Sequence, residues 1–320
     1  MGIILVYSEN LDESTNEVID WLCHYDARII RINAGNHLNI TLYDSITNVF
    51  HCEVNGISFC STEVKAVWYR KGEMYYPFSL ELEHKELGRI MDSYIEGEWR
   101  GLFEFFIEEL KQIRSLGSYS SRIFNKLNTL QLARKVGFSV PHTFIASSKK
   151  TVVQKLKTYD KLIVKGITDT PNINTQHIAV SAYTERVDND SLEKLPNVFL
   201  PSLFQEEIEK SYEVRSFMLK DKFYSMAIFS QENPKTITDF RKYDAANPNR
   251  TVPFQLDEAT EEKCRKLAQA LDLDTGSFDF IVSSLGQVIF LEINPVGQFM
   301  MVSKPCNYPI EKEIADYLIE

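Results

Sequence analysis

Short apolar runs alternate with amphipathic stretches along the first third of the chain. Residues 3–7 are five consecutive apolar positions, a pattern typical of a buried strand, and a polar segment ends them. Asp12 is suited to cap a helix that continues through Leu22. The other elements predicted here are strands over 28–32 and 64–69 and one long or two shorter helices over 81–115. This order predicts a small α/β domain over about the first 115 residues.

Strand-like runs become more frequent in the rest of the chain. A polar stretch over 115–121 predicts a linker, and the helix predicted over 125–136 is stopped by Gly137. A helix over 257–272 carries apolar residues at i, i+3, i+4 and i+7. The remaining predictions are strands over 162–165, 177–183, 198–205, 214–219, 223–229, 277–282 and 287–293 and a final helix over 310–318. This second part therefore reads as an α+β unit rich in antiparallel strands.

Composition and charge narrow the class of protein. The chain has 320 residues, of which 44% are hydrophobic and 25% charged, values that exclude a disordered or collagen-like chain. At about 150 residues per domain, this length predicts about two domains. The net charge of −10 gives no basic footprint for nucleic acid or for an anionic membrane, so neither is an expected partner.

Cysteine usage and hydropathy indicate the compartment. The five cysteines are scattered and show no zinc-like spacing, which predicts reduced thiols rather than disulfides or a zinc site. No run reaches the roughly 18 apolar residues of a transmembrane helix, and the apolar start of the chain has no basic flank. We therefore expect a cytoplasmic protein.

The most informative segment is the hairpin predicted over 277–293. A period of two places one set of side chains on the same face of its second strand: Val288, Phe290, Glu292 and Asn294. With a two- or four-residue loop, Asp279 lies across from Phe290 and diagonal to Glu292 on that face. Carboxylates beside apolar neighbours need a cation, and two carboxylates with an amide oxygen suit Mg²⁺. A solvated hairpin face with ordinary charges is the alternative.

Two lysines are candidates for phosphate binding. Lys126 follows the N-cap candidate Asn125, so it falls in the first helical turn, where the helix dipole opposes a cation and a phosphate would reverse that conflict. Lys165 closes an apolar strand before Gly166 and can reach a phosphate as a point charge. The alternatives are an exposed surface lysine at Lys126 and a strand end whose lysine reaches solvent at Lys165.

Another apolar strand ends in a polar segment, which consists of Gln205, Glu206, Glu207 and Ile208. Extended backbone at that point can present N–H and C=O groups to the edge of a purine. Either Glu207 or the later Glu213 can then reach ribose hydroxyls. An ordinary polar strand end is the alternative.

Two arginines are candidates for contacts with an anion. Glu213 and Arg215 are two apart in a strand, so both side chains point the same way. Arg215 offers planar, bidentate donors suited to a phosphate or a developing oxyanion. Arg241, two residues after Asp239, is a second candidate. Surface ion pairs, Glu213–Arg215 and Asp239–Arg241, are the alternatives.

The order of these features resembles the ATP-grasp ligases over residues 119–320. That resemblance implies that Lys126 and Lys165 bind phosphates of ATP, that Gln205 to Ile208 frame adenine, and that the hairpin trio holds Mg²⁺. Segments at both ends are similar to the ATP-grasp peptide maturases of the grasp-with-spasm group, relatives of the microviridin-type graspetide synthetases. Those segments are Ser14–Trp21, Val67–Gly72, Phe290–Phe299 and Asn307–Glu313.

The resemblance implies a layout for the whole chain. An α/β N-terminal (pre-ATP-grasp) domain over 1–118 would be followed by an α+β ATP-grasp central subdomain over 119–198. The C-terminal subdomain, over 199–320, would hold the metal site. One departure concerns the loop after Lys165: residues 167–174 contain no glycine, where many ATP-grasp enzymes have a glycine-rich loop. We expect a mobile loop that substrate orders.

The resemblance also implies an activity, the ATP-dependent cross-linking of side chains in a ribosomally made precursor peptide. A substrate Asp or Glu carboxylate would attack the γ-phosphate and give an acyl phosphate and ADP. A Ser or Thr hydroxyl, or a Lys amine, would then form an ω-ester or ω-amide, with Arg215 or Arg241 stabilising the oxyanion. The relatives further suggest a leader segment bound by strand addition on the central domain and a homodimer.

Two other functions remain open from the sequence. A ligase that adds free amino acids to a protein tail or to a small acid would share the nucleotide site and need no leader-binding surface. A catalytically silent nucleotide-binding scaffold is the non-enzyme alternative, and the complete metal trio argues against it.

Overall fold

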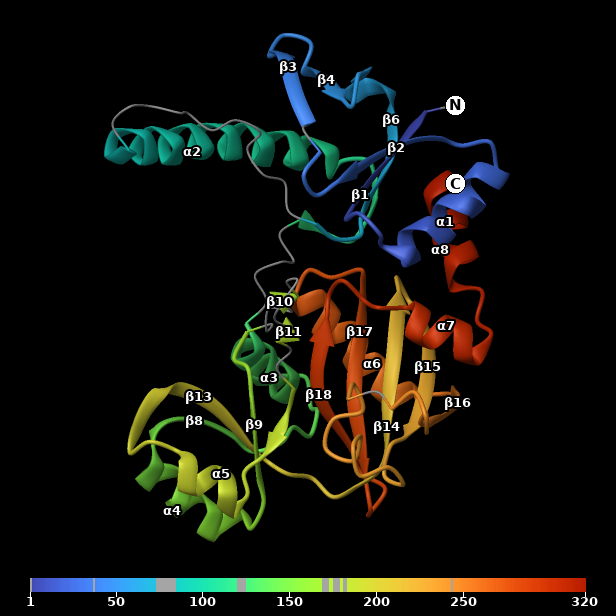
Figure 1. The fold of residues 1–320 in the computed structure, drawn as a ribbon. Helices are drawn as coiled ribbons and strands as arrows, with labels where there is room; N and C mark the ends of the chain where they lie inside the picture. The colour runs from blue at the N-terminus through green and yellow to red at the C-terminus, as the bar shows by residue number, and fades with distance from the viewer. Residues whose placement is uncertain are drawn as a thin grey trace. The chain divides into compact units, whose positions relative to one another are not determined.

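The computed structural model describes residues 2–36, 38–72, 85–119, 125–168, 173–174, 179–180, 183–242 and 244–320. The chain forms two compact units (Figure 1), one made of Met1–Ser121 with Pro309–Glu320 and the other of Arg122–Tyr308. The C-terminal segment therefore belongs by its contacts to the first unit. The division into domains at 118/119 and 198/199 stays a prediction, as does the closure of the loop over 167–174, which lies largely outside the described residues.

The first unit is built on a four-stranded parallel sheet in the order β2-β1-β6-β7. Its strands are β1 (Ile3–Ser8), β2 (Arg28–Asn33), β6 (Val64–Tyr69) and β7 (Arg114–Leu116), and its helices are α1 (Glu13–His24), α2 (Lys85–Leu110) and α8 (Ile310–Ile319). The strands predicted over 3–7, 28–32 and 64–69 are confirmed, and Asp12 caps α1 by accepting a hydrogen bond from the backbone N–H of Ser14. The helix predicted to reach residue 115 ends earlier, at Leu110.

A second, antiparallel sheet in this unit is absent from the sequence prediction. Its strands are β3 (Leu38–Asp44), β4 (Val49–Val54) and β5 (Ile57–Cys60), followed by a single 3₁₀ turn, η1 (Ser61–Glu63). Only alternate residues of β4 are buried: Phe50, Cys52 and Val54 join the core of the unit. Such short, half-exposed strands carry a weak hydrophobic signal.

The second unit contains two antiparallel sheets, the first in the order β12-β9-β13-β8. Its strands are β8 (Thr143–Ser148), β9 (Leu162–Lys165), β12 (Glu185–Arg186) and β13 (Val198–Glu206), with the helices α4 (Lys149–Tyr159) and α5 (Asn189–Lys194). One face packs against these helices through Val152, Leu162 and Phe204. Gln205 is next to Phe204 in the strand, so it points to the opposite face. A separate pair of two-residue strands, β10 (Ile173–Asn174) and β11 (Ala179–Val180), is also antiparallel.

The second sheet of this unit has the order β16-β15-β14-β17-β18. Its strands are β14 (Lys210–Leu219), β15 (Lys222–Phe229), β16 (Arg250–Phe254), β17 (Thr275–Ser283) and β18 (Val288–Asn294). The helices α3 (Lys126–Lys135) and α6 (Glu258–Ala270) share a core with one face of this sheet, and α7 (Met300–Cys306) follows β18. The predicted apolar stripe of α6 is confirmed, because Cys264, Leu267 and Ala268 lie in that core.

A β-bulge in β18 corrects the predicted register of the hairpin. Phe280 pairs with Phe290, whereas Asp279 pairs directly with Glu292, so Leu291 is an extra residue on this strand. The prediction that Asp279 lies across from Phe290 is therefore wrong, because the partner of Phe290 is the next residue, Phe280. The prediction that Phe290 and Glu292 share a face is also wrong, since Phe290 lies in the core and Glu292 lines a cavity on the other face. The bulge keeps the carboxylate of Glu292 out of the apolar core.

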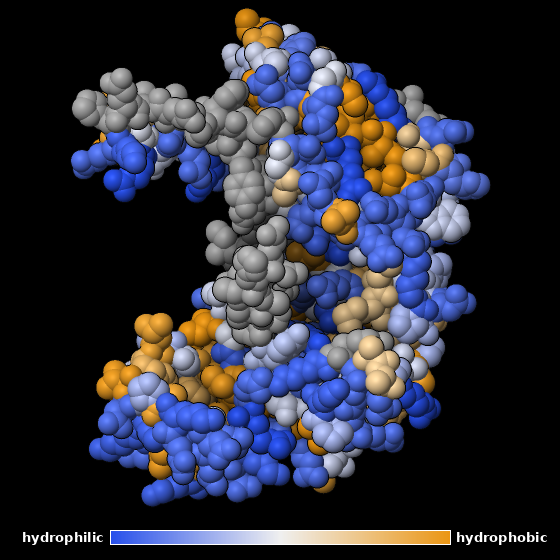
Figure 2. All heavy atoms as spheres, viewed as in Figure 1, coloured by the Kyte–Doolittle hydropathy of each residue, from blue (hydrophilic) through white to orange (hydrophobic). Residues whose placement is uncertain are grey.

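The surface of the second unit carries exposed apolar side chains over β8 and β13. Figure 2 shows them as an orange group at the lower left, and Ile145, Val198 and Leu200 are 40%, 76% and 84% exposed. Of the helices in the described part of the chain, none combines the length and the apolar character that crossing a membrane requires.

Candidate functional site

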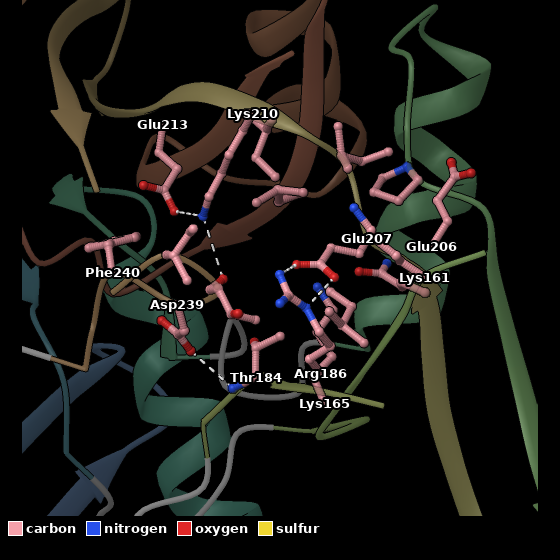
Figure 3. Close-up of a pocket in the computed structure, with 18 of the residues that line it drawn as sticks. Lys161, Lys165, Thr184, Arg186, Glu206, Glu207, Lys210, Glu213, Asp239 and Phe240 are labelled. Atoms are coloured by element: carbon pink, nitrogen blue, oxygen red, sulfur yellow. Dashed lines mark hydrogen bonds and ion pairs between the residues drawn. The ribbon is translucent and has the colours of Figure 1, made fainter. Parts of the chain in front are cut away.

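A cavity of about 670 Å³ lies between the four-stranded sheet and the five-stranded sheet of the second unit (Figure 3). It receives side chains from both sheets and from the first turn of α3. The sequence-predicted residues that line it are Lys126, Lys165, Gln205, Glu206, Glu207, Ile208, Glu213, Arg241, Asp279 and Glu292. Segments from distant parts of the sequence thus bring most of the predicted site together in one place.

The carboxylates of Asp279 and Glu292 mark one end of the cavity. They are direct cross-strand partners on β17 and β18. Lys126 Nζ lies 3.5 Å from Glu292 Oε2, and Arg215 Nε lies 3.6 Å from Asp279 Oδ1. Arg215 is not among the cavity-lining residues and reaches the site from β14 through Asp279.

Asn125 explains why Lys126 is held at this end. Its side-chain oxygen accepts hydrogen bonds from the backbone N–H groups of Leu127 and Asn128, at 3.0 and 3.2 Å. This N-cap begins α3 at Lys126 and satisfies backbone donors that the helix itself leaves open. The predicted cap is confirmed, and Lys126 contacts a carboxylate instead of pointing only to solvent.

Burial and charge act in opposite directions on these groups. Burial raises the pKa of Asp279 to about 6, although the guanidinium of Arg215 counteracts part of the rise. Burial also disfavours ionisation of Glu292, but Lys165 and Lys126 outweigh it and lower the pKa of Glu292. For Lys165, burial lowers the pKa and the charge of Glu292 partly offsets that change. The ionised form of Glu292 and the charged form of Lys165 therefore stabilise each other.

Some buried polar atoms of the site lack a hydrogen-bond partner within the described part of the chain. Among the described residues, the buried atoms Arg215 Nε and Asp279 Oδ1 have no hydrogen-bond partner, although the Nη1 of Arg215 donates to Met301 Sδ at 3.5 Å. Leaving a buried polar atom without a partner costs about 1–3 kcal/mol. Carboxylate oxygens are ligands that Mg²⁺ prefers, and a lysine ammonium binds phosphate as a point charge. The residues present therefore fit a magnesium nucleotide.

Asn294 is placed differently from the other two members of the predicted trio. It pairs with Ser277 at the end of β18, and its side-chain oxygen accepts a hydrogen bond from the backbone N–H of Val296 at 3.0 Å. It does not line the cavity. Its role as a metal ligand stays a prediction.

The polar end of β13 forms another part of the cavity wall. Gln205 is fully buried and donates from Nε2 to Thr143 Oγ1 at 2.8 Å, while its Oε1 has no hydrogen-bond partner within the described part of the chain. Glu206 accepts a hydrogen bond from the backbone N–H of His142 at 2.9 Å. This arrangement leaves a fixed polar wall of the kind that the edge of a purine requires.

Glu207 faces a partner that the sequence did not indicate. Figure 3 shows its carboxylate pairing with one edge of the guanidinium of Arg186, through Nε and Nη2, and the Nε lies 2.6 Å from Glu207 Oε2. Its backbone N–H donates to the carbonyl of Lys161 at 3.0 Å. Arg186 is on β12, so this ion pair joins the edge strand to the end of β13.

Glu213 is buried and does not form the surface pair with Arg215 that was the alternative. It pairs with Lys210, and Ser230 Oγ donates to its Oε2 at 2.6 Å. Burial raises its pKa, and Lys210 counteracts part of that rise. The Lys-x-x-Glu spacing was the only sequence signal for Lys210, and Ser230 gave none.

Arg241 is held by Asp239, as the alternative expected, but this pair lies in the cavity wall. The Nε and Nη2 of Arg241 donate to the two carboxylate oxygens of Asp239, at 2.9 and 2.7 Å. The Asp239 side chain is only 4% exposed. The carboxylate of this pair is therefore buried, whereas the Arg241 side chain is 45% exposed.

Comparison with known proteins places this geometry in context. No protein-family model matches the chain, and no curated protein matches it significantly. The structure is similar to a solved RiPP-associated ATP-grasp ligase from Chryseobacterium gregarium in complex with ADP and a leader and core peptide, with 26% identity and a TM-score of 0.82. That match covers 100% of this chain and 97% of that chain.

Two further solved structures match over nearly their full length. The macrocyclase MdnC from Microcystis aeruginosa, bound with precursor peptide MdnA, is 24% identical with a TM-score of 0.77, and 99% of each chain is covered. The ATP-grasp ligase PsnB, complexed with a minimal precursor, Mg and ADP, is 16% identical with a TM-score of 0.70, covering 99% of this chain and 96% of that chain.

The mixed α/β fold is that of the ATP-grasp ligases. Within that class, the chain is similar along its whole length to the RiPP-associated ligases, the graspetide-type peptide maturases. The resemblance predicted from the sequence motifs is thus confirmed.

Proposed function

We propose that the chain is an ATP-dependent ligase that macrocyclises a ribosomally made precursor peptide and uses Mg²⁺. The observation that carries the proposal is the end of the cavity where Asp279 and Glu292 meet Lys126 and Arg215 at salt-bridge distance. The solved relatives support it, since they include ligases and a macrocyclase with precursor peptides, ADP and Mg.

The first step is the activation of a substrate Asp or Glu side chain. That carboxylate attacks the γ-phosphorus of ATP, the bond to the β-phosphate oxygen breaks, and an acyl phosphate and ADP result. When bound, the magnesium nucleotide supplies the phosphoryl group and neutralises much of the triphosphate charge. Lys126 and Lys165 hold phosphates, and Asp279, Glu292 and Asn294 hold the metal. These charges allow one anion to approach another.

The second step joins two side chains of the peptide. A Ser or Thr hydroxyl, or a Lys amine, attacks the activated carbonyl, loses its proton and displaces inorganic phosphate, which gives an ω-ester or ω-amide. Arg215 or Arg241 stabilises the oxyanion that forms on the carbonyl oxygen. In another part of the cavity wall, Gln205 to Ile208 frame the adenine and Glu213 orients the ribose side.

Leader recognition belongs on the sheet of β8, β9, β12 and β13. Strand β8 is an edge of that sheet, and exposed apolar residues lie on it and on the neighbouring β13. An extended leader segment can add to such an edge through backbone hydrogen bonds. The homodimer and the cytoplasmic location suggested by the sequence stay predictions, and light scattering of the purified chain tests the first.

The test is incubation of the purified chain with ATP, Mg²⁺ and a candidate precursor peptide encoded nearby. Mass spectrometry of the peptide should show the loss of one water molecule for each cross-link, and one ADP should form for each cross-link. A gain equal to an amino-acid residue would instead support ligation of free amino acids. Nucleotide binding with no product would support a silent scaffold. The matched control omits ATP and should leave the peptide mass unchanged.

A further inference from the structure

Asp239 is saturated with hydrogen bonds in the cavity wall. Its Oδ1 accepts from the Nε and the backbone N–H of Arg241, at 2.9 and 3.0 Å. Its Oδ2 accepts from Arg241 Nη2 at 2.7 Å and from the backbone N–H of Thr184 at 3.0 Å. An ionised carboxylate has about four acceptor positions. Asp239 therefore has no acceptor position left for a metal ion or for a substrate donor, although it lies in the cavity wall.

Asp239 pairs with one edge of the Arg241 guanidinium. A guanidinium has five N–H donors, and Asp239 uses the Nε–H and one N–H of Nη2. The remaining three donors are the two of Nη1 and the second one of Nη2. Arg241 lines the cavity together with Asp279 and Glu292. The arginine side chain is long and 45% exposed, so it can adopt many rotamers when its two side-chain hydrogen bonds to Asp239 are absent.

The same carboxylate also connects two segments of the cavity wall. Figure 3 shows the hydrogen bond from the backbone of Thr184, just before β12, to Asp239. Beside it, Lys242 Nζ lies 2.7 Å from Glu185 Oε1 and 5.9 Å from the centre of the Tyr183 ring. Thr184 is 9% exposed and Asp239 5% exposed, so this connection lies in the protein interior.

We propose that Asp239 is a positioning residue of the ligase reaction: it holds the guanidinium of Arg241 with its free edge toward the reacting anion and fixes it to the backbone of Thr184. This inference rests on the proposed function and goes beyond it, because Asp239 touches neither substrate nor metal. Asparagine at this position would keep the shape but replace one acceptor oxygen with a donor. That donor would face the N–H groups of Arg241 or Thr184, and the paired hydrogen bonds to the guanidinium would be lost.

The test is a double-mutant cycle between Asp239→Asn and Arg241→Ala, read as ADP formation with peptide, ATP and Mg²⁺. Each single variant should lower kcat by about 100-fold, the size of effect seen when one oriented anion-stabilising donor is lost, with a much smaller change in KM for ATP. The double variant should lose no more than Arg241→Ala alone, since Asp239 acts through Arg241. Asp239→Glu, which keeps both acceptor oxygens, should recover part of the rate.

Asp244→Asn is the matched control. Asp244 is a carboxylate of the same segment, accepts from Asn233 Nδ2 at 3.2 Å and does not line the cavity. Its kcat should stay near that of the wild type. A wild-type enzyme that forms neither ADP nor dehydrated peptide would contradict the proposed function and this inference together. An active wild type whose Asp239→Asn variant keeps its kcat, or a double variant whose losses multiply, would overturn the inference alone.

Discussion

Individual side chains in the cavity are stabilised by neighbours of opposite charge. Glu292 is balanced by Lys126 and Lys165, and Asp279 by Arg215. Removal of one member leaves its partner as a buried charge without compensation, which is more costly than the pair itself. The residue types and their order were readable from the sequence. The partners Thr184 and Arg186 were not, because separations in sequence carry no information about which segments lie side by side.

Asp239 gives a prediction about stability against pH. Burial opposes its ionisation, but the hydrogen bonds and charge of Arg241 and the N–H of Thr184 outweigh it and lower its pKa from 3.8 to about 2. The lowered pKa means that ionised Asp239 adds to the free energy of unfolding. This stabilisation is fully present above pH 3.8 and is lost as the pH falls through about 2. At 1.36 kcal/mol per pKa unit, it amounts to about 2 kcal/mol at neutral pH.

Urea unfolding of the wild type and of Asp239→Asn at a series of pH values checks this prediction. The wild type should be the more stable protein at neutral pH, and the gap should narrow as the pH falls through the range from 3.8 to about 2. Lys165 and Glu213 also feel the charge of Asp239, so the variant's own pH dependence serves as the baseline. A gap that stays constant as the pH falls through that range would contradict the assignment.

Elements of the fold divide into those with a strong local signal and those without one. The caps Asp12 and Asn125 and the stripe of α6 are local patterns, and each is found in the structure. The bulge at Leu291 is not a local pattern, because it is fixed by Phe290 packing into the core while Glu292 stays in the cavity. The elements of the second unit that the sequence did not predict are β8, α4, β10, β12, α5, β16 and α7.

The cap of α3 gives a prediction at this scale. Asn125→Ala removes the acceptor for two backbone N–H groups and should lower the free energy of unfolding by about 1 kcal/mol. Because Lys126 is the first residue of this helix, the affinity for the magnesium nucleotide should fall as well. Asn125→Asp keeps the acceptor and is the control, with stability close to that of the wild type. An alanine variant as stable as the aspartate variant would show that the cap contributes nothing.

The two units of the molecule are connected by the chain more than once. Helix α8 was predicted with nearly its observed bounds, but its place in the first unit could not be predicted, since an amphipathic pattern does not specify its partner. It packs against α1, where Tyr25 donates a hydrogen bond to Asp316 at 2.7 Å. The class of ligase was readable from the order of motifs. That the C-terminal helix packs in the first unit could be learned only from the structure.

Deletion of Pro309–Glu320 tests this arrangement. Hydrogen exchange should become faster in α1 and in the neighbouring β6, which lose the buried face of α8, whereas β14 and β17 in the second unit should keep their protection. Tyr25→Phe, which loses one hydrogen bond, should give a smaller change of the same kind, about 1 kcal/mol. Unchanged exchange in α1 after the deletion would contradict the assignment of α8 to the first unit.

Calorimetric titration of the chain with a non-hydrolysable ATP analogue, with and without Mg²⁺, tests the central claim most directly. The wild type should bind the analogue about tenfold or more tightly with Mg²⁺, equivalent to about 1.4 kcal/mol. Asp279→Asn and Glu292→Gln should lose that dependence, whereas Glu262→Gln, at a half-exposed position on α6, should keep it. The same dependence on Mg²⁺ in both cavity variants as in the wild type would contradict the account.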